Sequence, residues 1–557
     1  MVRERIWWND VEPHQGVFTW GRYENLINAY SARGIAVDEI WHDTPEWAKS
    51  RAGSGTSIPP RLDALRGFCL EAAKHYRGKV TAWEVWNEPD NHGTFFDGTP
   101  QEFAGVMSVS YKALKEGSNG DAMVLQGAMC LKDDRSFAHN LFALGAGKYT
   151  DAFNWHSYES PDSYGSILSN YRKDCNLGKM PSWMTEAGIF LGANGENGEL
   201  SVDDSHHQCE YLPKSVAQSL ACGNAKHFFF LLPYRDEGGA CLGALRKDLT
   251  PNPSVVALSA AVHLLGNCSY LQTVEFEGAA SDKRPIHAVS VFFSNPAGGK
   301  TAVVWADEKC EMVIRGDATA PVNDIKATNI FGTINTLSVA FDGLHIRLSP
   351  EPVYILFPKP KSLFPFNENF SSQKDTDSRW RYTDNGGNIT IGGGFLKIGG
   401  NGSGYPLFET VGNPFPEKGD WTASIGYRYT TIGNYGTEVK FVQADGKAVA
   451  TIHQDVNGQY VALGDHRVWQ SKADTHWHVV SFVQNDQQLH VFVDNATEVG
   501  SVGSVEMPCL IHIGGGRMPN PWDWNDLTLR FVRVQPGKQP LQLPALKEGL
   551  GTVDDLP

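Results

Sequence analysis

The 557-residue sequence lacks a paired-cysteine pattern, a long apolar segment and an excess of positive charge. Its nine cysteines include no Cys-x-x-Cys, so we expect free, mostly buried thiols and no zinc site or disulfide framework. No apolar run reaches the roughly 18 residues of a membrane span, so no membrane partner is expected. The net charge of −15 argues against nucleic acid.

The first predicted strand is not followed by a glycine-rich phosphate loop, which disfavours a nucleotide-binding fold. What the chain does contain is typical of a large globular protein, with 41% hydrophobic and 11% aromatic residues. Sixteen tryptophans suit a protein that stacks sugars, although tryptophan also fills large cores. The negative charge fits a neutral substrate.

Strand-like and helix-like segments alternate through residues 1–265, the first predicted domain. This alternation favours a parallel sheet with right-handed crossovers. A (β/α)₈ barrel is the leading architecture and a doubly wound open sheet is the alternative. The last strand is continuously apolar, which predicts that both of its faces are covered. The predicted strands cover residues 2–8, 35–41, 83–90, 122–130, 151–158, 181–190 and 226–232.

After Gly266 the pattern changes to short β runs separated by Gly, Pro and Asn turns. Residues 266–360 are predicted to form an accessory β-sandwich, which ends at the linker Pro358-Lys-Pro-Lys-Ser. A second all-β domain is expected over 366–536. Residues 537–557 are expected to be a loose tail.

Two glutamates follow predicted strands within the first domain. Pro89 stops the strand that precedes it, so Glu88 lies at a carboxyl end, where the chemistry of parallel α/β proteins is found. Glu186 ends the strand three positions later, and in a closed barrel the two would face each other across the mouth. Such a pair suits glycoside hydrolysis, and a structural ion pair is the alternative.

Four short motifs make this interpretation specific. Trp86-Asn87-Glu88-Pro89 resembles the acid/base motif of clan A glycoside hydrolases, and Thr185-Glu186-Ala187-Gly188 resembles their nucleophile motif. Trp155-His156-Ser157-Tyr158 is similar to their sixth-strand motif, and Arg3 to the arginine of their second strand. The segment Val11–Trp20 resembles families 39 and 5 of that clan.

The resemblance implies a retaining double displacement. Glu88 would be the general acid and base, and Glu186 the ionised nucleophile, with the carboxyls about 5–5.5 Å apart. Two like charges so close push one pKa up, which would supply the acid. Asn87 would bind the sugar 2-hydroxyl, Tyr158 would hold Glu186, and Arg3 would keep it ionised. No metal or other cofactor is expected at this site.

Four further side chains near these strand ends have two readings each. His42 and His156 would line the innermost sugar subsite, or belong to the core. Trp41 and Trp155 would stack on sugar faces, or pack inside the barrel.

Met1 stands on what resembles the second strand of the clan A pattern. We therefore expect a gene model that lost its first βα unit, with a unit that is missing or replaced as the alternative. A signal peptide would have been lost with that unit, and a secreted or periplasmic protein is expected.

The 366–536 region resembles concanavalin-like or laminin-G-like jelly rolls. Such modules bind glycans or structural calcium, and a packing module without a ligand is the alternative. Trp522 and Trp524 are candidates for a sugar platform in this region.

The sequence therefore predicts a retaining β-glycoside hydrolase acting on a polysaccharide or oligosaccharide. The alternatives are a non-catalytic carbohydrate-binding protein derived from such an enzyme, and a transglycosylase. The sugar, the linkage, exo or endo action and the oligomeric state are not specified by the sequence.

Overall fold

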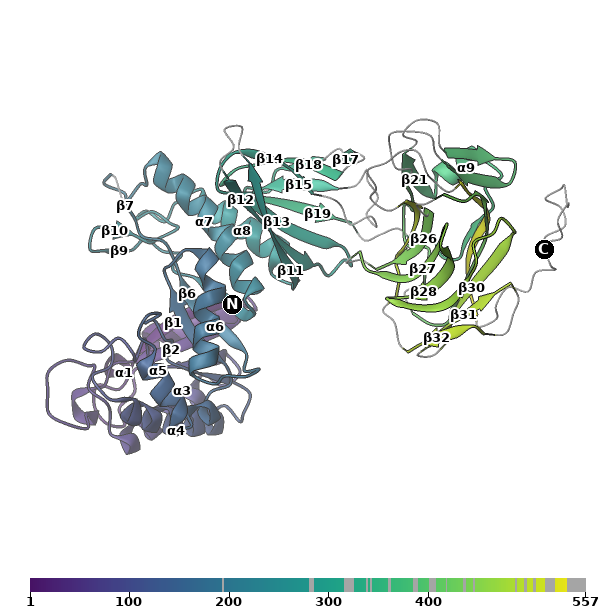
Figure 1. Ribbon diagram of the computed structural model, residues 1–557. Helices are drawn as coiled ribbons and strands as arrows, with labels where there is room; N and C mark the ends of the chain where they lie inside the picture. Colours follow the sequence, from purple (N-terminus) through teal and green to yellow (C-terminus); the bar gives the residue numbers. More distant parts are fainter. Residues whose placement is uncertain are drawn as a thin grey trace.

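The computed structural model shows three parts that follow one another in space in chain order (Figure 1). Trp522, Trp524 and nearly all of the 537–557 tail lie outside the described residues. The structure describes residues 1–192, 195–279, 285–314, 325–336, 339–340, 343–358, 362–383, 389–399, 407–416, 418–433, 437–443, 446–485, 488–494, 498–503, 507–515 and 526–537.

The first part contains seven parallel strands, and each overlaps a predicted one. They form a sheet β1-β2-β3-β4 and a sheet β5-β6-β8. Parallel bridges Leu125–Ala152 and Met129–Trp155 connect β4 to β5, so the seven follow one order. Within the described residues, no pairing joins β8 to β1. The strands are β1 (Val2–Trp7), β2 (Val37–His42), β3 (Val80–Val85), β4 (Met123–Gln126), β5 (Phe153–Ser157), β6 (Ser182–Ala187) and β8 (Asn224–Phe229).

Helices connect these strands and cover them from outside (Figure 1). The sequence Thr99-Pro100-Gln101-Glu102 has the capping-box pattern, and this capping box is present at the start of α4, where Thr99 and Glu102 satisfy each other's backbone amides. The helices are α1 (Trp8–Val11), α2 (Gly21–Ser31), α3 (Leu62–His75), α4 (Pro100–Gly117), α5 (Ser136–Ala143), α6 (Tyr164–Asp174), α7 (Val202–Ala221) and α8 (Ser254–Leu265).

The strands enclose side chains in layers. An apolar layer of Ala82, Leu125, Ala152 and Trp183 is fully or almost fully buried. Charged and polar side chains lie nearer the carboxyl ends of the strands, where the candidate site is found. This division leaves a packed floor beneath a polar mouth.

The prediction that strand 226–232 is covered on both faces is wrong. Lys226 of β8 is exposed, and Phe228 and Phe229 are only half-buried. In the described part of the chain β8 pairs with β6 alone. An apolar run indicates a strand that can be buried, but not whether a partner covers its second side.

The second part has two sheets, of which the larger packs on helices α7 and α8. Val216 of α7 and Ala261 of α8 share one hydrophobic cluster with Val289, Val303 and Tyr354 of that sheet. The larger sheet has the order β11-β12-β13-β19-β15-β16 and the smaller β14-β18-β17. The strands are β11 (Ser269–Ala279), β12 (Pro285–Ser294), β13 (Lys300–Ala306), β14 (Cys310–Ile314), β15 (Lys326–Asn329), β16 (Ile334–Thr336), β17 (Val339–Ala340), β18 (Gly343–Leu348) and β19 (Val353–Phe357).

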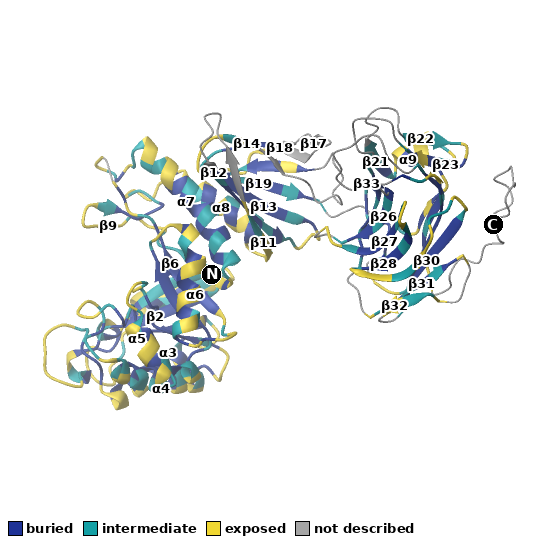
Figure 2. Cartoon of the chain, viewed as in Figure 1, coloured by how far each residue is buried: buried dark blue, intermediate teal, exposed yellow. Residues whose placement is uncertain are grey.

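The third part is also β-rich, with two antiparallel sheets around one core (Figure 2). One sheet runs β22-β23-β34-β25-β30-β31-β32, with β20 on β34, and the other runs β21-β24-β33-β26-β27-β28-β29. Its elements are β20 (Phe366–Glu368), α9 (Gln373–Asp377), β21 (Trp380–Thr383), β22 (Ile389–Gly392), β23 (Phe395–Ile398), β24 (Leu407–Thr410), β25 (Trp421–Thr431), β26 (Thr437–Val442), β27 (Ala448–Asp455), β28 (Gly458–Leu463), β29 (His466–Ser471), β30 (His478–Asn485), β31 (Gln488–Val493), β32 (Gly500–Val502), β33 (Leu510–Gly515) and β34 (Asp526–Pro536).

All nine cysteines are free thiols. Among the described helices, none combines the length and the apolar character needed to cross a membrane.

Candidate active site

Glu88 lies just beyond β3 in a backbone turn that few side chains adopt. The φ angles of Trp86 and Glu88 are 76° and 39°, in the left-handed region. Strand β3 therefore ends at Val85, earlier than Pro89 requires. Gly127 permits this turn, because a Cβ there would lie 2.7 Å from the Trp86 carbonyl oxygen. Such strain, held by the surrounding structure, is often found at functional sites.

Glu186 sits in β6 and is held by three side chains from other strands. Arg3 Nη1 lies 2.6 Å from its Oε1, and the Tyr158 hydroxyl donates to its Oε2 at 2.8 Å. Arg5 Nη2 lies 3.6 Å from Oε1. Glycine is required at position 188, because a Cβ there would lie 2.5 Å from the Phe230 carbonyl oxygen and 3.1 Å from the Tyr158 ring.

Glu186 is ionised by this environment. Burial alone would raise its pKa, but the charges of His156, Arg3 and Arg5 and the Tyr158 hydrogen bond together lower it to about 2. A permanently ionised carboxylate that accepts its hydrogen bonds on both oxygens is suited to act as a nucleophile.

Glu88 faces Glu186 across His156. One oxygen of each glutamate and a ring nitrogen of His156 all lie within 4.8 Å of one another. His156 Nδ1 is 2.8 Å from Glu88 Oε1 and 3.7 Å from Glu186 Oε2. Asn91 donates to the other oxygen of Glu88 at 3.4 Å. The two carboxylate side chains are 12% and 6% exposed, so both reach the surface of the site.

A hydrogen-bond chain behind His156 places a proton between it and Glu88. The Thr185 hydroxyl donates to Asn154 Oδ1 at 2.8 Å, so it can only accept from His156 Nε2, which is 3.1 Å away. Nε2 therefore carries hydrogen. His156 Nδ1 and Glu88 Oε1, 2.8 Å apart, can then share one proton in their hydrogen bond.

Asn87 is oriented by both arginines. Its Oδ1 accepts from Arg3 Nη2 and Arg5 Nη2, each at 3.3 Å. The amide NH₂ remains directed elsewhere and can donate to a ligand hydroxyl. Arg3 itself is anchored by a fork on Glu84, with Nε and Nη2 each 2.8 Å from a carboxylate oxygen.

The two candidate sugar-stacking tryptophans, Trp41 and Trp155, are both buried. Trp41 is 0% exposed, and its ring meets those of Trp8, Phe68 and Trp86 edge to face. It cannot stack on a sugar, because its side chain leaves the strand on the helix-covered face. Trp155 is equally buried and donates to Asn224 at 3.0 Å.

His42 is buried at the end of β2, against the rings of Trp86 and Phe95. Its Nδ1 lies 2.9 Å from Asp43 Oδ1. Burial lowers the pKa of His42, so its imidazole is neutral. It shares Trp86 with the Glu88 turn but does not contact either glutamate among the described interactions.

A divalent cation is poorly suited to this cluster, although Glu88, His156 and Glu186 are close enough to be considered as ligands. Arg3 and Arg5 both lie within 3.6 Å of Glu186 Oε1. Their positive charges would repel a cation at the same carboxylate.

Sequence reasoning missed Arg5, Glu84, Asn91 and Thr185. The spacing of Glu84 from Glu88 is not informative, because the left-handed turn at Trp86 and Glu88 follows the end of β3. Arg5 carries a usable signal, because it lies two residues from Arg3 along β1. Side chains at such spacing share a face. Thr185 and Asn91 carry no comparable signal, because their roles depend on hydrogen-bond directions.

Replacing Tyr158 with phenylalanine tests the contact with Glu186. Burial and the negative charge of Glu186 raise the pKa of Tyr158 well above its usual value, so the side chain donates as a neutral phenol. Loss of one hydrogen bond to a charged group is expected to lower kcat roughly 10- to 100-fold. Steady-state kinetics on an aryl β-glycoside would measure this, with the buried Tyr164→Phe variant as the matched control.

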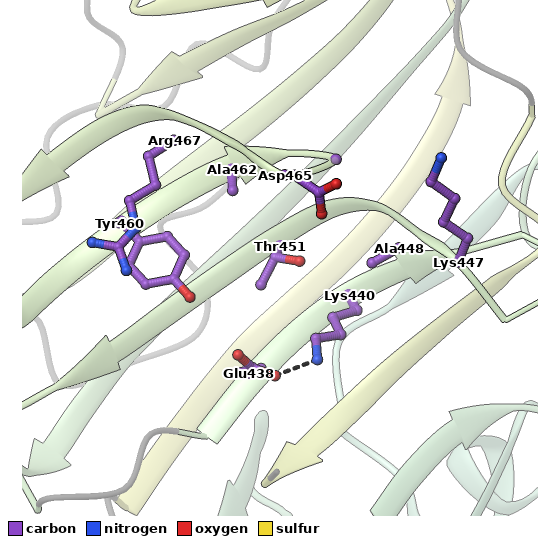
Figure 3. Close-up of a pocket in the computed structure, with 10 residues that line it drawn as sticks. Glu438, Lys440, Lys447, Ala448, Thr451, Tyr460, Ala462, Asp465 and Arg467 are labelled. Carbon is purple, nitrogen blue, oxygen red and sulfur yellow. Dashed lines mark ion pairs between the residues drawn. The ribbon is translucent and has the colours of Figure 1, made fainter.

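A second candidate region is a hollow of about 360 Å³ on the sheet of β26–β29 (Figure 3). Small side chains such as Thr451 and Ala462 form its floor, and longer polar ones surround them. The Tyr460 ring is already stacked on His453 at 4.7 Å, and Arg467 lies 4.0 Å from the centre of that ring. The hollow is therefore polar and offers little bare aromatic surface.

Residues 3–111 match the family model of glycosyl hydrolase family 10. An endo-1,4-beta-xylanase of Agaricus bisporus is 28% identical over 119 residues, which is 20% of this chain and 34% of that protein. Endo-1,4-beta-xylanase A of Phanerodontia chrysosporium is 32% identical over 91 residues, 15% of this chain and 21% of that protein. The matched stretches thus span about a third or less of these relatives.

One solved structure shares the fold over a longer stretch. It is a family 39 glycoside hydrolase from Bacteroides cellulosilyticus WH2, with a TM-score of 0.51 and 16% identity, covering 64% of this chain and 74% of that one. The predicted likeness to clan A is confirmed, although the matching sequence model is family 10 rather than family 5. By local sequence match and by fold, the chain resembles the TIM-barrel glycoside hydrolases of clan A.

Proposed function

We propose that this protein is a retaining β-glycoside hydrolase that uses Glu186 as nucleophile and Glu88 as acid and base. The observation that carries this is the spacing of the pair, with oxygens of the two carboxylates within 4.8 Å. Retaining enzymes hold their carboxyls about 5–5.5 Å apart, and inverting ones about 6.5–9.5 Å, to admit a water. The strands that carry them are inferred to belong to a (β/α)₈-type barrel.

In the first step, Glu88 gives its proton to the glycosidic oxygen as the bond to the anomeric carbon breaks. An oxygen of Glu186 forms the new bond to that carbon, which produces a glycosyl ester. The negative charge that Tyr158 and Arg3 stabilise on Glu186 is consumed as this ester bond forms. The Asn87 amide is placed to bind a sugar hydroxyl.

In the second step, Glu88 has become a carboxylate and takes a proton from water. The hydroxide equivalent attacks the anomeric carbon from the face that the leaving group vacated. The ester bond breaks and Glu186 returns to its ionised form. Two inversions give overall retention of configuration.

A β-1,4-linked xylan or its oligomers is the proposed substrate class, because the relatives matched over residues 3–111 are named endo-1,4-beta-xylanases. A panel of aryl β-glycosides and polysaccharides, offered to the purified chain, tests this. Cleavage of xylosides above glucosides, galactosides and mannosides supports it. Binding of glycans with no cleavage favours the non-catalytic alternative. Net transfer to an added sugar acceptor favours transglycosylation.

The hollow on β26–β29 is proposed as a glycan-binding surface of the third part. A structural calcium ion somewhere in the third part is a separate proposal. Thr451→Arg would fill the floor of the hollow and is expected to weaken retention on a xylan-containing affinity gel. Thr430→Arg on the other sheet is the control, and equal loss in both variants would refute the proposal. A rise of the melting temperature with calcium over chelator would test the ion.

A further inference from the structure

The interior beneath the candidate site holds one more carboxyl than its arginines can neutralise. Arg3 contacts Glu84 and Glu186, and Arg5 contacts Glu186. Asp38 lies on β2 between them, since its Cα pairs with Arg3 on one side and Ala82 on the other. Two guanidinium groups balance two carboxylates, so the third has no cation left.

Asp38 is wholly enclosed. It is 0% exposed, and neither of its carboxyl oxygens receives a hydrogen bond from a donor in the described structure. The Glu84 carboxylate, itself 0% exposed, is close enough to Asp38 to share a hydrogen bond with it. Two ionised carboxylates are acceptors only, and cannot bond to each other. The contact is satisfied only if a proton lies between them.

We propose that Asp38 is a permanently protonated carboxylic acid that donates its proton to Glu84, and that it acts as a positioning residue for Arg3 and Glu186. Glu84 then has its Arg3 fork and the Asp38 proton as partners. Arg3 is held in the one orientation that also reaches Glu186 Oε1.

The electrostatics agree with this arrangement. Burial, followed by the charge of Glu84, raises the pKa of Asp38 well above its usual value. The pKa of Glu84 is lowered, because Arg3 and the Asp38 hydrogen bond outweigh the effect of its burial. The proton of the pair therefore belongs to Asp38.

The arrangement has a consequence for the proposed reaction, on which this role of Asp38 rests. When Glu186 becomes an ester it loses its charge, and Arg3 loses one partner. The fork on Glu84 remains, so Arg3 stays in place until Glu186 is released. An ionised Asp38 would compete for Arg3 and would turn it away from the nucleophile.

Two variants of nearly equal shape separate this role from simple packing. Asp38→Asn keeps a donor towards Glu84 and mimics the protonated acid. This variant is expected to stay within about threefold of the wild-type kcat. The acidic limb of its profile of kcat/KM against pH is expected to be unchanged. Asp38→Leu removes the donor. It is expected to lose about tenfold or more in kcat and to move the acidic limb up by about one pH unit.

Glu39→Gln is the matched control. Glu39 is also buried on β2 and its carboxyl has no described hydrogen-bond partner. Alternation along the strand directs it to the opposite face, so among the described interactions it senses the charge of Arg3 but forms no ion pair with it. This variant is expected to leave the acidic limb in place. If Asp38→Asn loses as much activity as Asp38→Leu, the proposal is wrong.

An infrared measurement keeps the test independent of turnover. Wild-type protein near pH 7 is expected to show the carbonyl stretch of a protonated carboxylic acid that disappears in Asp38→Asn and remains in Glu39→Gln at reduced intensity. Absence of a band specific to Asp38 overturns the proposal, whether or not the protein cleaves glycosides. If the Asp38 band is present but the protein cleaves no glycoside, the proposed hydrolase activity is wrong and the proposal of a protonated Asp38 still holds.

Discussion

Glu186→Ala is expected to lower kcat on an aryl β-glycoside by a factor on the order of 10⁴–10⁶, the range for loss of a catalytic nucleophile. The remaining cavity lies on the face of the sugar from which Glu186 would attack. Sodium azide should therefore restore turnover and yield a glycosyl azide of inverted configuration. Nuclear magnetic resonance of the product would establish that configuration.

Glu88→Ala is the counterpart that distinguishes the two roles. A good phenolate leaving group needs no proton, so ester formation at Glu186 is expected to continue while its hydrolysis slows. Azide should then attack the accumulated ester and give a glycosyl azide of retained configuration. The same product from both variants, or wild-type rates in either, would contradict the assignment.

Arg3→Leu is expected to destabilise the folded protein by about 3–5 kcal/mol, because two buried carboxylates lose their shared partner. The side chains of Arg3, Glu84 and Glu186 are 9%, 0% and 6% exposed, so water cannot replace the guanidinium. Urea unfolding near pH 7 would measure the change. Activity should fall with it, because Glu186 would lose one of the groups that lower its pKa and fix its position.

The pH dependence of the destabilisation by Arg3→Leu follows from the lowered pKa of Glu186. Glu186 has a pKa lowered from 4.5 to about 2, so it stabilises the wild type above about pH 4.5, and this contribution disappears as the pH falls towards 2. In Arg3→Leu the pKa of Glu186 rises, and protonation relieves the unpaired charge. The gap between variant and wild type should therefore narrow as the solution is acidified.

Arg5→Leu is the control for this experiment. Its side chain is 28% exposed and 3.6 Å from Glu186, so it should cost about 1 kcal/mol or less. Equal destabilisation by both substitutions would show that Arg3 has no special anchoring role.

The strand order and the site motifs could be predicted from the sequence, because both depend on local patterns. The alternation of strand-like with helix-like segments predicted each of the seven parallel strands, and the capping box at Thr99 marked the start of α4. Glu88 and Glu186 were placed at strand ends, which parallel pairing brings to one side. The structure puts them within 4.8 Å, with Arg3, Asn87, Tyr158 and His156 around them.

The features that could not be predicted from the sequence depend on the direction in which a side chain points and on neighbours that are distant in the sequence. Trp41 and His42 are adjacent on one strand, and only the orientation of β2 decides which of them faces the helices. The β8 segment is apolar, yet its burial depends on a neighbouring strand. Asp38 reads as an ordinary polar residue in a strand, because its significance comes from Arg3 and Glu84, which are distant in sequence.

The hydrophobic cluster shared by α7, α8 and the larger sheet of the second part makes the folding of the two parts interdependent. Val216, Ala261 and Leu265 are buried there against Val291 and Trp305. A gene fragment ending at the last helix would leave these side chains facing water and would favour aggregation. Residues 1–265 and the following sheet are therefore expected to fold and unfold together.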